Sequence, residues 1–349
     1  MIELRSDTFT LPTQEMLAAA ATAPLGDDVW GEDPTVTRLE QKSAELLGKE
    51  SALFVTSGTM GNLLALLSQT RRGDEVIAGD KSHIVNAEAA GSAVVGGLQL
   101  RTLANTRDGT LNVDELQAAI RPVDVHYPRT ALICLENSHN QCGGAVFGRE
   151  YLGRVRGVAD HAGVAVHLDG ARIFNAAVSL GLRTADLVAD ADSVTFCLSK
   201  GLSAPVGSVL CGRAGFIDRA RKYRKMLGGG MRQAGVIAAP GIVALDTMIG
   251  RLAEDHRHAR RLGEALNRIP GITVDLETLA TNIVVAELEP TGLGAADAVA
   301  RLEDVGVKIA AVGERKIRLV THRNVSSADV DGAIDAFEQV FQAQALASA

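Results

Sequence analysis

Short apolar runs alternate with amphipathic stretches over the first two thirds of the chain. Residues 35–47 show the apolar spacing of one helix face and end at Gly48, a residue type that commonly stops a helix. Two further stretches with helical character cover residues 62–69 and 149–161. Seven short runs predict strands: 52–55, 75–78, 98–103, 131–135, 164–168, 193–198 and 207–211. This alternation predicts a mostly parallel sheet with helices on both faces.

The pattern changes after the glycine run at residues 228–230. The stretch 237–266 predicts one long helix that leads out of the sheet domain. Beyond it the order is α+β, with strands predicted at 281–288 and 316–322 and helices at 295–305 and 327–342. We therefore predict an α/β protein of three parts: an N-terminal arm at 1–15, a large α/β domain at 16–247 and a small α+β domain at 248–349.

Composition narrows the class of protein. The 349 residues are 46% hydrophobic but only 3% aromatic, so we expect a large core built from Ala, Val, Leu and Ile. The formal net charge is −7, and no run of Lys and Arg is dense enough to favour nucleic acid. No apolar stretch is long enough for a bilayer, and charges near Met1 argue against a secretion signal. The four cysteines lack the paired spacing of a zinc site, so we expect no metal and a cytoplasmic protein.

Two of the predicted strands end next to an ionisable residue. Asp169 follows the run 164–168, and Lys200 follows the run 193–198 thirty-one positions later. Enzymes that use pyridoxal 5'-phosphate (PLP) need such a pair. The lysine amine forms a Schiff base with the cofactor aldehyde, and the acid keeps the pyridine nitrogen protonated. Each residue alone also has an ordinary interpretation, as a solvated lysine or as an aspartate that caps a helix.

The strand-to-helix turn at residues 57–62 (SGTMGN) is a candidate phosphate site. Backbone N–H groups at a helix N-terminus attract an anion, and Gly58 and Thr59 would allow its close approach. No Lys-Ser or Lys-Thr pair follows, which disfavours a nucleotide P-loop, and the glycine spacing differs from that of a dinucleotide-binding turn. His83 follows the next strand and is either a ring-stacking, proton-exchanging residue or an ordinary surface histidine.

Together the motifs resemble those of the threonine aldolases, the low-specificity enzymes for L-threonine and L-allo-threonine, which are PLP-dependent enzymes of fold type I. The likeness follows the chain in order through residues 4–8, 27–34, 57–62, 82–83, 132–140, 167–172, 199–201, 228–233 and 318–322. The runs GGGMRQ at 228–233 and DGAR at 169–172 are the most discriminating. The resemblance implies the PLP-dependent transferase-like fold, with a large and a small domain.

The resemblance implies roles for individual cofactor-binding residues. Lys200 would hold PLP as an internal aldimine, and Asp169 would pair with the pyridinium nitrogen. Gly58 and Thr59 would bind the phosphate. Arg232 would be a further cation on the phosphate side, of the kind often presented across a subunit interface, although it could also merely cap a helix.

The same resemblance places an amino acid substrate beside the cofactor. Ser6, Arg172 and Arg318 would bind its carboxylate, with the arginines as bidentate forks, and Arg172 would also contact the cofactor. His83 would stack on the ring, and His126 would lie near the substrate hydroxyl. Two acids are further candidates for the site: Asp7 and Glu88.

Several of these residues also allow ordinary interpretations. Arg172 could form an ion pair with Asp169, Arg318 could face solvent from its strand, and His126 could be an exposed loop residue. The base that takes the proton of the β-hydroxyl also stays open, since His83, His126 or a water that they hold could act.

The reaction implied is retro-aldol cleavage of L-threonine, L-allo-threonine and related L-β-hydroxy-α-amino acids to glycine and an aldehyde. The alternatives are a PLP-dependent β-eliminating lyase, an aminotransferase, which must admit a second substrate, and a catalytically idle binding protein of the same fold. Low aromatic content disfavours the first, and the presence of Lys200 with the arginines disfavours the last. We expect a homotetramer built as a dimer of dimers, with active sites at the dimer interface and with neither nucleic acid nor membrane as partner.

Overall fold

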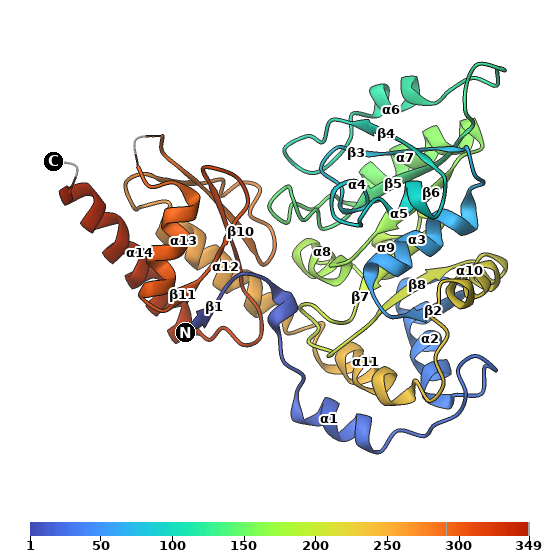
Figure 1. The fold of residues 1–349 in the computed structure, drawn as a ribbon, viewed down its shortest axis with the longest axis horizontal. Helices are drawn as coiled ribbons and strands as arrows, with labels where there is room; N and C mark the ends of the chain where they lie inside the picture. Colours follow the sequence, from blue (N-terminus) through green and yellow to red (C-terminus); the bar gives the residue numbers. More distant parts are fainter. Residues whose placement is uncertain (291, 348–349) are drawn as a thin grey trace.

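The computed structural model describes residues 1–290 and 292–347, which form a large and a small lobe (Figure 1). The large lobe contains a sheet whose strands are, in spatial order, β2 (Ser51–Val55), β8 (Ser208–Gly212), β7 (Ser193–Cys197), β6 (Ala165–Asp169), β5 (Thr130–Glu136), β3 (Glu75–Gly79) and β4 (Gln99–Leu103). Strand β8 is antiparallel to β2 and β7, and the remaining neighbours are parallel. The mostly parallel α/β sheet predicted from the sequence is confirmed.

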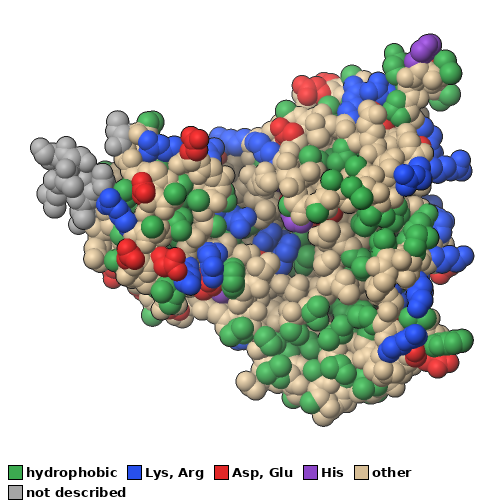
Figure 2. All heavy atoms as spheres, in the orientation of Figure 1, with side chains coloured by type: hydrophobic (Ala, Val, Ile, Leu, Met, Phe, Trp, Pro, Cys, Tyr) green, Lys and Arg blue, Asp and Glu red, His purple; other side chains and the backbone are tan. Residues whose placement is uncertain are grey.

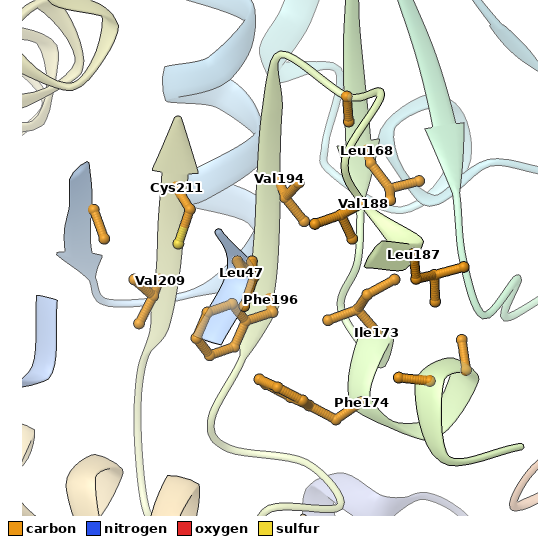
Figure 3. Close-up of a cluster of buried hydrophobic side chains, with 14 of the residues drawn as sticks. Leu47, Leu168, Ile173, Phe174, Leu187, Val188, Val194, Phe196, Val209 and Cys211 are labelled. Carbon is orange, nitrogen blue, oxygen red and sulfur yellow. The ribbon is translucent and has the colours of Figure 1, made fainter. Parts of the chain in front are cut away.

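Helices cover both faces of this sheet. They are α2 (Pro34–Leu47), α3 (Gly58–Gln69), α4 (His83–Asn86), α5 (Gly91–Val94), α6 (Val113–Ala119), α7 (Arg149–Ala162), α8 (Ile173–Leu180), α9 (Thr184–Leu187), α10 (Ala214–Met226) and α11 (Gly235–Thr247). Adjacent residues of β2 enter different clusters. Phe54 belongs to the large cluster that includes residues of α2, α7, α8 and α11, whereas Leu53 belongs to a smaller one with residues of α3 and α10. Figure 3 shows part of the larger cluster, where Phe174 and Phe196 meet edge to face at 5.2 Å between ring centroids.

Local sequence explains where α2 begins and ends. The Asp33 carboxylate accepts hydrogen bonds from the N–H groups of Thr35 and Val36, each at 3.0 Å, and Pro34 occupies the first turn, where its missing N–H is not needed. Gly48 follows the last turn with a left-handed φ of 62°. The prediction of a helix over residues 35–47 is therefore accurate to one residue.

The small lobe has its own sheet and core. Strands β12 (Ala310–Ala311), β13 (Lys316–Val320), β10 (Ile283–Leu288) and β9 (Ile272–Val274) form an antiparallel sheet in that order. Three helices pack on it: α12 (Leu252–Leu266), α13 (Ala295–Asp304) and α14 (Ser327–Ala347). The N-terminal strand β1 (Ile2–Glu3) pairs with β11 (Val307–Lys308), and Leu4 joins the small-lobe core. A short helix at Asp7–Phe9 and then α1 (Gln14–Ala21) return the chain to the large lobe, where α1 packs on α11.

Two element predictions are wrong in detail. The single long helix expected over 237–266 is two helices, α11 and α12, which are bent by 71° relative to each other. Helix α3 begins at Gly58 rather than at Asn62, because the Ser57 hydroxyl accepts a hydrogen bond from the Met60 N–H and starts the helix earlier. Among the described helices, none alone has the length and apolar character of a membrane span, and one bent pair, α11 with α12, meets those criteria together.

Candidate active site

The C-terminal ends of the central strands bring the ionisable residues together. Glu136 ends β5 and Asp169 ends β6, and the two are direct neighbours in the parallel register. Lys200 follows the end of β7, which pairs with β6. This edge of a parallel sheet is where α/β proteins place their ligands. The structure therefore brings Lys200 and Asp169 to the same edge, as the spacing of the two runs predicts.

The carboxylate of Asp169 is buried and held by neutral groups. Its Oδ2 accepts from Asn62 Nδ2 at 2.8 Å, and its Oδ1 accepts from the N–H of Ala171 at 3.0 Å. Asn62 is fixed in turn by His167, whose Nε2 lies 3.1 Å from Asn62 Oδ1. Burial lowers the pKa of His167 to about 4, so this histidine is neutral. The negative charge of Asp169 is thus available to a cation on a ligand, as a protonated pyridine nitrogen would be.

His83 and Glu88 form a hydrogen-bonded pair beside Asp169. His83 Nδ1 lies 2.8 Å from Glu88 Oε1, which also accepts from Asn62 Nδ2 at 2.8 Å. The bond to Glu88 raises the pKa of His83, against burial and the positive charge of Lys200. One ligand atom from each of His83, Glu88 and Asp169 lies within 4.8 Å of the other two. The carboxyl groups of Glu88 and Asp169 therefore share one donor, the amide of Asn62.

Two guanidinium groups approach one another at the opposite side of the site. Arg172 uses Nε and Nη2 to bind the two oxygens of Asp7, both at 2.7 Å, and the pair is buried. Its Nη1 and the Nη1 of Arg318 each donate to Asn140 Oδ1 at 3.3 Å. Arg318 Nε is buried and lacks a hydrogen-bond partner in the described part of the chain. Burial and the charge of Arg172 lower the pKa of Arg318, as expected where an anion would be stabilising.

This arrangement changes the expected role of Arg172. We expected a bidentate fork for the substrate from each arginine, and neither residue was expected to bind Asp7. Asp7 occupies two donor groups of Arg172, and the third, Nη1, contacts Asn140 at 3.3 Å, whereas Arg318 Nε has no partner among the described residues. The alternative of an ion pair between Arg172 and Asp169 is also not what the structure shows, because the partner of Arg172 is Asp7.

The N-terminal arm passes directly over the lysine. Thr10 Oγ1 donates to the carbonyl oxygen of Lys200 at 2.9 Å, and the Ser203 N–H donates to the same oxygen at 2.8 Å. Burial raises the pKa of Asp7, but the charges of Arg172 and Lys200 hold it well below its usual range. Ser6 precedes Asp7, and its hydroxyl accepts from the N–H of Thr8 at 3.2 Å. Lys200, Asp7 and Ser6 are therefore grouped at the arginine side of the site.

The N-terminus of α3 lies against β7. A Cβ on Gly58 would come within 3.0 Å of Cys197 Sγ, and one on Gly61 within 2.6 Å of Thr195 Cγ2. The two glycines therefore let the helix start approach the strand that leads to Lys200. The N–H groups of Gly58 and Thr59 precede the first intrahelical hydrogen bond, from the N–H of Gly61 to the carbonyl oxygen of Ser57, and the phosphate site at this turn stays a prediction.

Two predicted site residues lie apart from this group within one chain. The His126 side chain is 81% exposed, and its Nδ1 lies 2.7 Å from Asp124 Oδ1. The Arg232 side chain is 60% exposed, and its Nη1 donates to Asp27 Oδ2 at 3.2 Å. The structure of a single chain therefore does not bring either residue to the site.

A cavity of about 650 Å³ adjoins the arginines. It lies between the loop at residues 140–143 and the small-lobe sheet, with Asn140 and Arg318 in its wall. Figure 2 shows basic side chains in the hollow between the two lobes, and three of the cavity residues are Lys81, Arg107 and Lys316. The side of the site that holds Arg318 thus opens toward this cavity, in which Asp275 pairs with Arg107 and Glu287 lies 3.8 Å from Lys316.

Sequence analysis did not single out Asn62, Glu136 or Asn140. All three lie inside runs that carry the family resemblance, 57–62 and 132–140, but no local pattern gives them a role. Their importance comes from contacts across the sheet, between residues as far apart in sequence as Asn62 and Asp169. Asn and Glu after a strand are otherwise common turn and cap residues.

Comparison with known proteins identifies the family of this chain. The family described as beta-eliminating lyase matches residues 3–289. A probable low-specificity L-threonine aldolase 2 of Arabidopsis thaliana is 47% identical over 344 residues, 97% of each chain. A low specificity L-threonine aldolase of Escherichia coli (strain K12) is 44% identical over 326 residues, 93% of this chain and 95% of that protein. The fold matches that of a Leishmania major threonine aldolase with a TM-score of 0.83 at 21% identity, over 98% of this chain and 100% of that one. The chain therefore belongs to the beta-eliminating lyase family and, within it, to the threonine aldolases, which are carbon–carbon lyases.

Proposed function

We propose that this protein uses PLP to cleave L-threonine, L-allo-threonine and related L-β-hydroxy-α-amino acids to glycine and an aldehyde. The observation that carries the proposal is the placement of Lys200 and Asp169 at adjoining strand ends, with the half-buried Arg318 close by, whose Nε has no hydrogen-bond partner among the described residues. A lysine, a carboxylate held by neutral donors and an arginine without its anion match the aldehyde, the ring nitrogen and the substrate carboxylate, respectively.

The residues fit PLP at each of its charged groups. Lys200 would bind the cofactor aldehyde through its amine, and Asp169 would pair with the protonated ring nitrogen. The N–H groups of Gly58 and Thr59, at the start of α3, would hold the phosphate. His83 would lie against the ring. When bound, the cofactor supplies an electron sink for the charge that C–C cleavage leaves at Cα.

The chain's own residues would then orient the substrate and move its protons. Arg318 would hold the substrate carboxylate together with Nη1 of Arg172 and the hydroxyl of Ser6. The position of the carboxylate would then determine which bond at Cα stands perpendicular to the plane of the cofactor ring. Because Glu88 occupies His83 Nδ1, the other ring nitrogen is left to take the proton of the β-hydroxyl. We therefore favour His83 as the base.

A second copy of the chain would supply the remaining groups. Exposed apolar side chains surround both predicted residues that lie apart from the site: Val123, Val125 and Tyr127 near His126, and Leu25, Trp30 and Val236 near Arg232. Such side chains are typical of a subunit interface. We propose a homotetramer built as a dimer of dimers, in which His126 and Arg232 enter the site of a neighbouring subunit. The cysteines are all free thiols, which fits the cytoplasmic location that we propose.

The test combines an absorbance spectrum with a product assay. The purified protein should show the visible band of lysine-bound PLP, and Lys200→Ala should abolish it. L-Threonine should release acetaldehyde, detected as NADH oxidation by alcohol dehydrogenase. A band without acetaldehyde from L-threonine or L-allo-threonine would refute the substrate assignment but keep the cofactor. A protein that shows no band after addition of PLP would refute the whole proposal.

A further inference from the structure

Glu136 is a buried carboxylate at the centre of the site that has no role in the function proposed above. It is 5% exposed and lies beside Asp169 at the end of β5. Its Oε2 accepts a hydrogen bond from the backbone N–H of His83 at 2.7 Å. Its Oε1 accepts one from the backbone N–H of Asn140 at 2.8 Å. One side chain thus binds two loops that are far apart in sequence.

The two loops hold opposite sides of the site. His83 is the first residue of α4, and the residue before it, Ser82, makes no side-chain capping bond to that helix, so Glu136 provides the missing acceptor. Asn140 is the residue whose Oδ1 accepts from both Arg172 and Arg318. Glu136 therefore joins the start of α4 to the residue that contacts both arginines.

We propose that Glu136 is a positioning residue that fixes the histidine loop and the arginine-binding loop relative to each other. This inference rests on the proposed function, because it assigns Glu136 to the geometry of the same site. It predicts that the carboxylate matters for binding of the amino acid carboxylate and not only for folding.

The surroundings of Glu136 explain why a carboxylate is needed. Burial and the neighbouring charge of Asp169 raise its pKa, and the two N–H donors act in the opposite direction. The other groups near it include the imidazole of His83, that of His139, whose Nδ1 is 3.8 Å from Oε1, and the guanidinium of Arg172, whose pKa the charge of Glu136 helps to raise. Burial lowers the pKa of His139 to about 4, so His139 is neutral and supplies no counter-charge. The direct hydrogen bonds to Glu136 come from the two backbone N–H groups.

The experiment compares Glu136→Gln with a matched control, Glu75→Gln. Glutamine keeps the shape of the side chain but places an NH₂ group against one of the two N–H donors. Glu75 is also buried, but it lies at the opposite end of the neighbouring strand β3 and binds Arg121. Both variants are loaded with PLP. Glycine affinity is read from the change in absorbance of the bound cofactor, KM and kcat for L-threonine are measured, and unfolding midpoints are recorded.

We expect Glu136→Gln to weaken glycine binding and to raise KM by about tenfold, the effect of one lost charge-assisted hydrogen bond. Glu75→Gln should leave both quantities within about twofold of the wild type while lowering the unfolding midpoint. If Glu136 acts through Asn140, the effects of Glu136→Gln and Asn140→Ala on glycine affinity should be less than additive in the double variant.

The outcomes separate this inference from the proposed function. Equal glycine affinities for Glu136→Gln and Glu75→Gln would overturn the positioning role. Full additivity of the effects of Glu136→Gln and Asn140→Ala on glycine affinity would also overturn it. Neither result would contradict the proposed function if the wild type is active. A wild-type protein that binds neither PLP nor glycine would instead overturn the proposed function. If Glu136→Gln does not fold, Glu136→Asp replaces it. Aspartate keeps the charge but is too short for both amides, and wild-type glycine affinity in that variant would also overturn the role.

Discussion

The ion pair between Asp7 and Arg172 should make a large contribution to the free energy of unfolding, although Asp7 belongs to the N-terminal arm. The substitution Asp7→Asn keeps the size of the side chain and removes its charge. Arg172 would remain buried, with two of its donors facing a neutral amide in place of a carboxylate at 2.7 Å. Leaving one partner of a buried pair without its counter-charge costs about 3–5 kcal/mol. That is a large share of the roughly 5–15 kcal/mol by which native proteins are stable.

The assay is urea unfolding of both proteins at neutral pH, followed by circular dichroism. The control is Asp275→Asn. Asp275 pairs with Arg107, but the two side chains are 39% and 59% exposed, so the loss should stay below about 1 kcal/mol. If Asp7→Asn destabilises the protein no more than Asp275→Asn, the view that this pair anchors the N-terminal arm is refuted.

The pH dependence gives a second check on the same pair. Although burial opposes it, Arg172 holds the pKa of Asp7 below its usual range in the folded protein. A carboxylate with a lowered folded-state pKa stabilises the protein above its unfolded pKa of about 3.9, and this contribution is lost as the pH falls toward the folded-state value. The stability difference between the wild type and Asp7→Asn should therefore be constant from pH 7 to about pH 5 and then shrink in acid. A difference that grows on acidification would contradict the assignment.

Two further substitutions test the base and the phosphate site. Glu88→Gln replaces the carboxylate that raises the pKa of His83 with a neutral amide, so the acidic limb of kcat/KM should move to lower pH in a pH–rate profile. A move to higher pH would exclude His83 as a base that must be unprotonated. Gly61→Ala would place a methyl group 2.6 Å from Thr195 Cγ2, which should displace the start of α3 and weaken PLP binding about tenfold in equilibrium dialysis. Gly157→Ala, at a helix position with no atom within 4 Å of the new Cβ, should leave PLP affinity unchanged, and equal affinities for the two variants would argue against a phosphate site at α3.

The features that could be predicted from the sequence are those set by neighbours in the chain. The helix over 35–47 follows from its cap, its apolar spacing and Gly48, and the strand ends before Asp169 and Lys200 follow from two apolar runs. The break between α11 and α12 was missed because the only local signal in residues 248–251 is Gly250, and an isolated glycine is tolerated within a helix; the chain turns there to enter the second core. The pairing of Asp7 with Arg172 could not be predicted, because it joins residues 165 positions apart whose sequence contexts each suit several partners.

The β1–β11 pairing has a consequence for when the active site can form during synthesis. Ile2 is made long before its strand partner, Val307, and the N–H of Val320 donates to the carbonyl oxygen of Leu4. The seven-stranded sheet is complete once Gly212 has been made, but residues 2–4 have no strand to pair with until the ribosome has released the small-lobe strands. During that interval only the contacts with the large lobe can hold the arm, such as the pair of Asp7 with Arg172. Translation that stops before residue 307 would leave a large lobe without Arg318, a product that proteases should cut first at the unpaired start of the N-terminal arm.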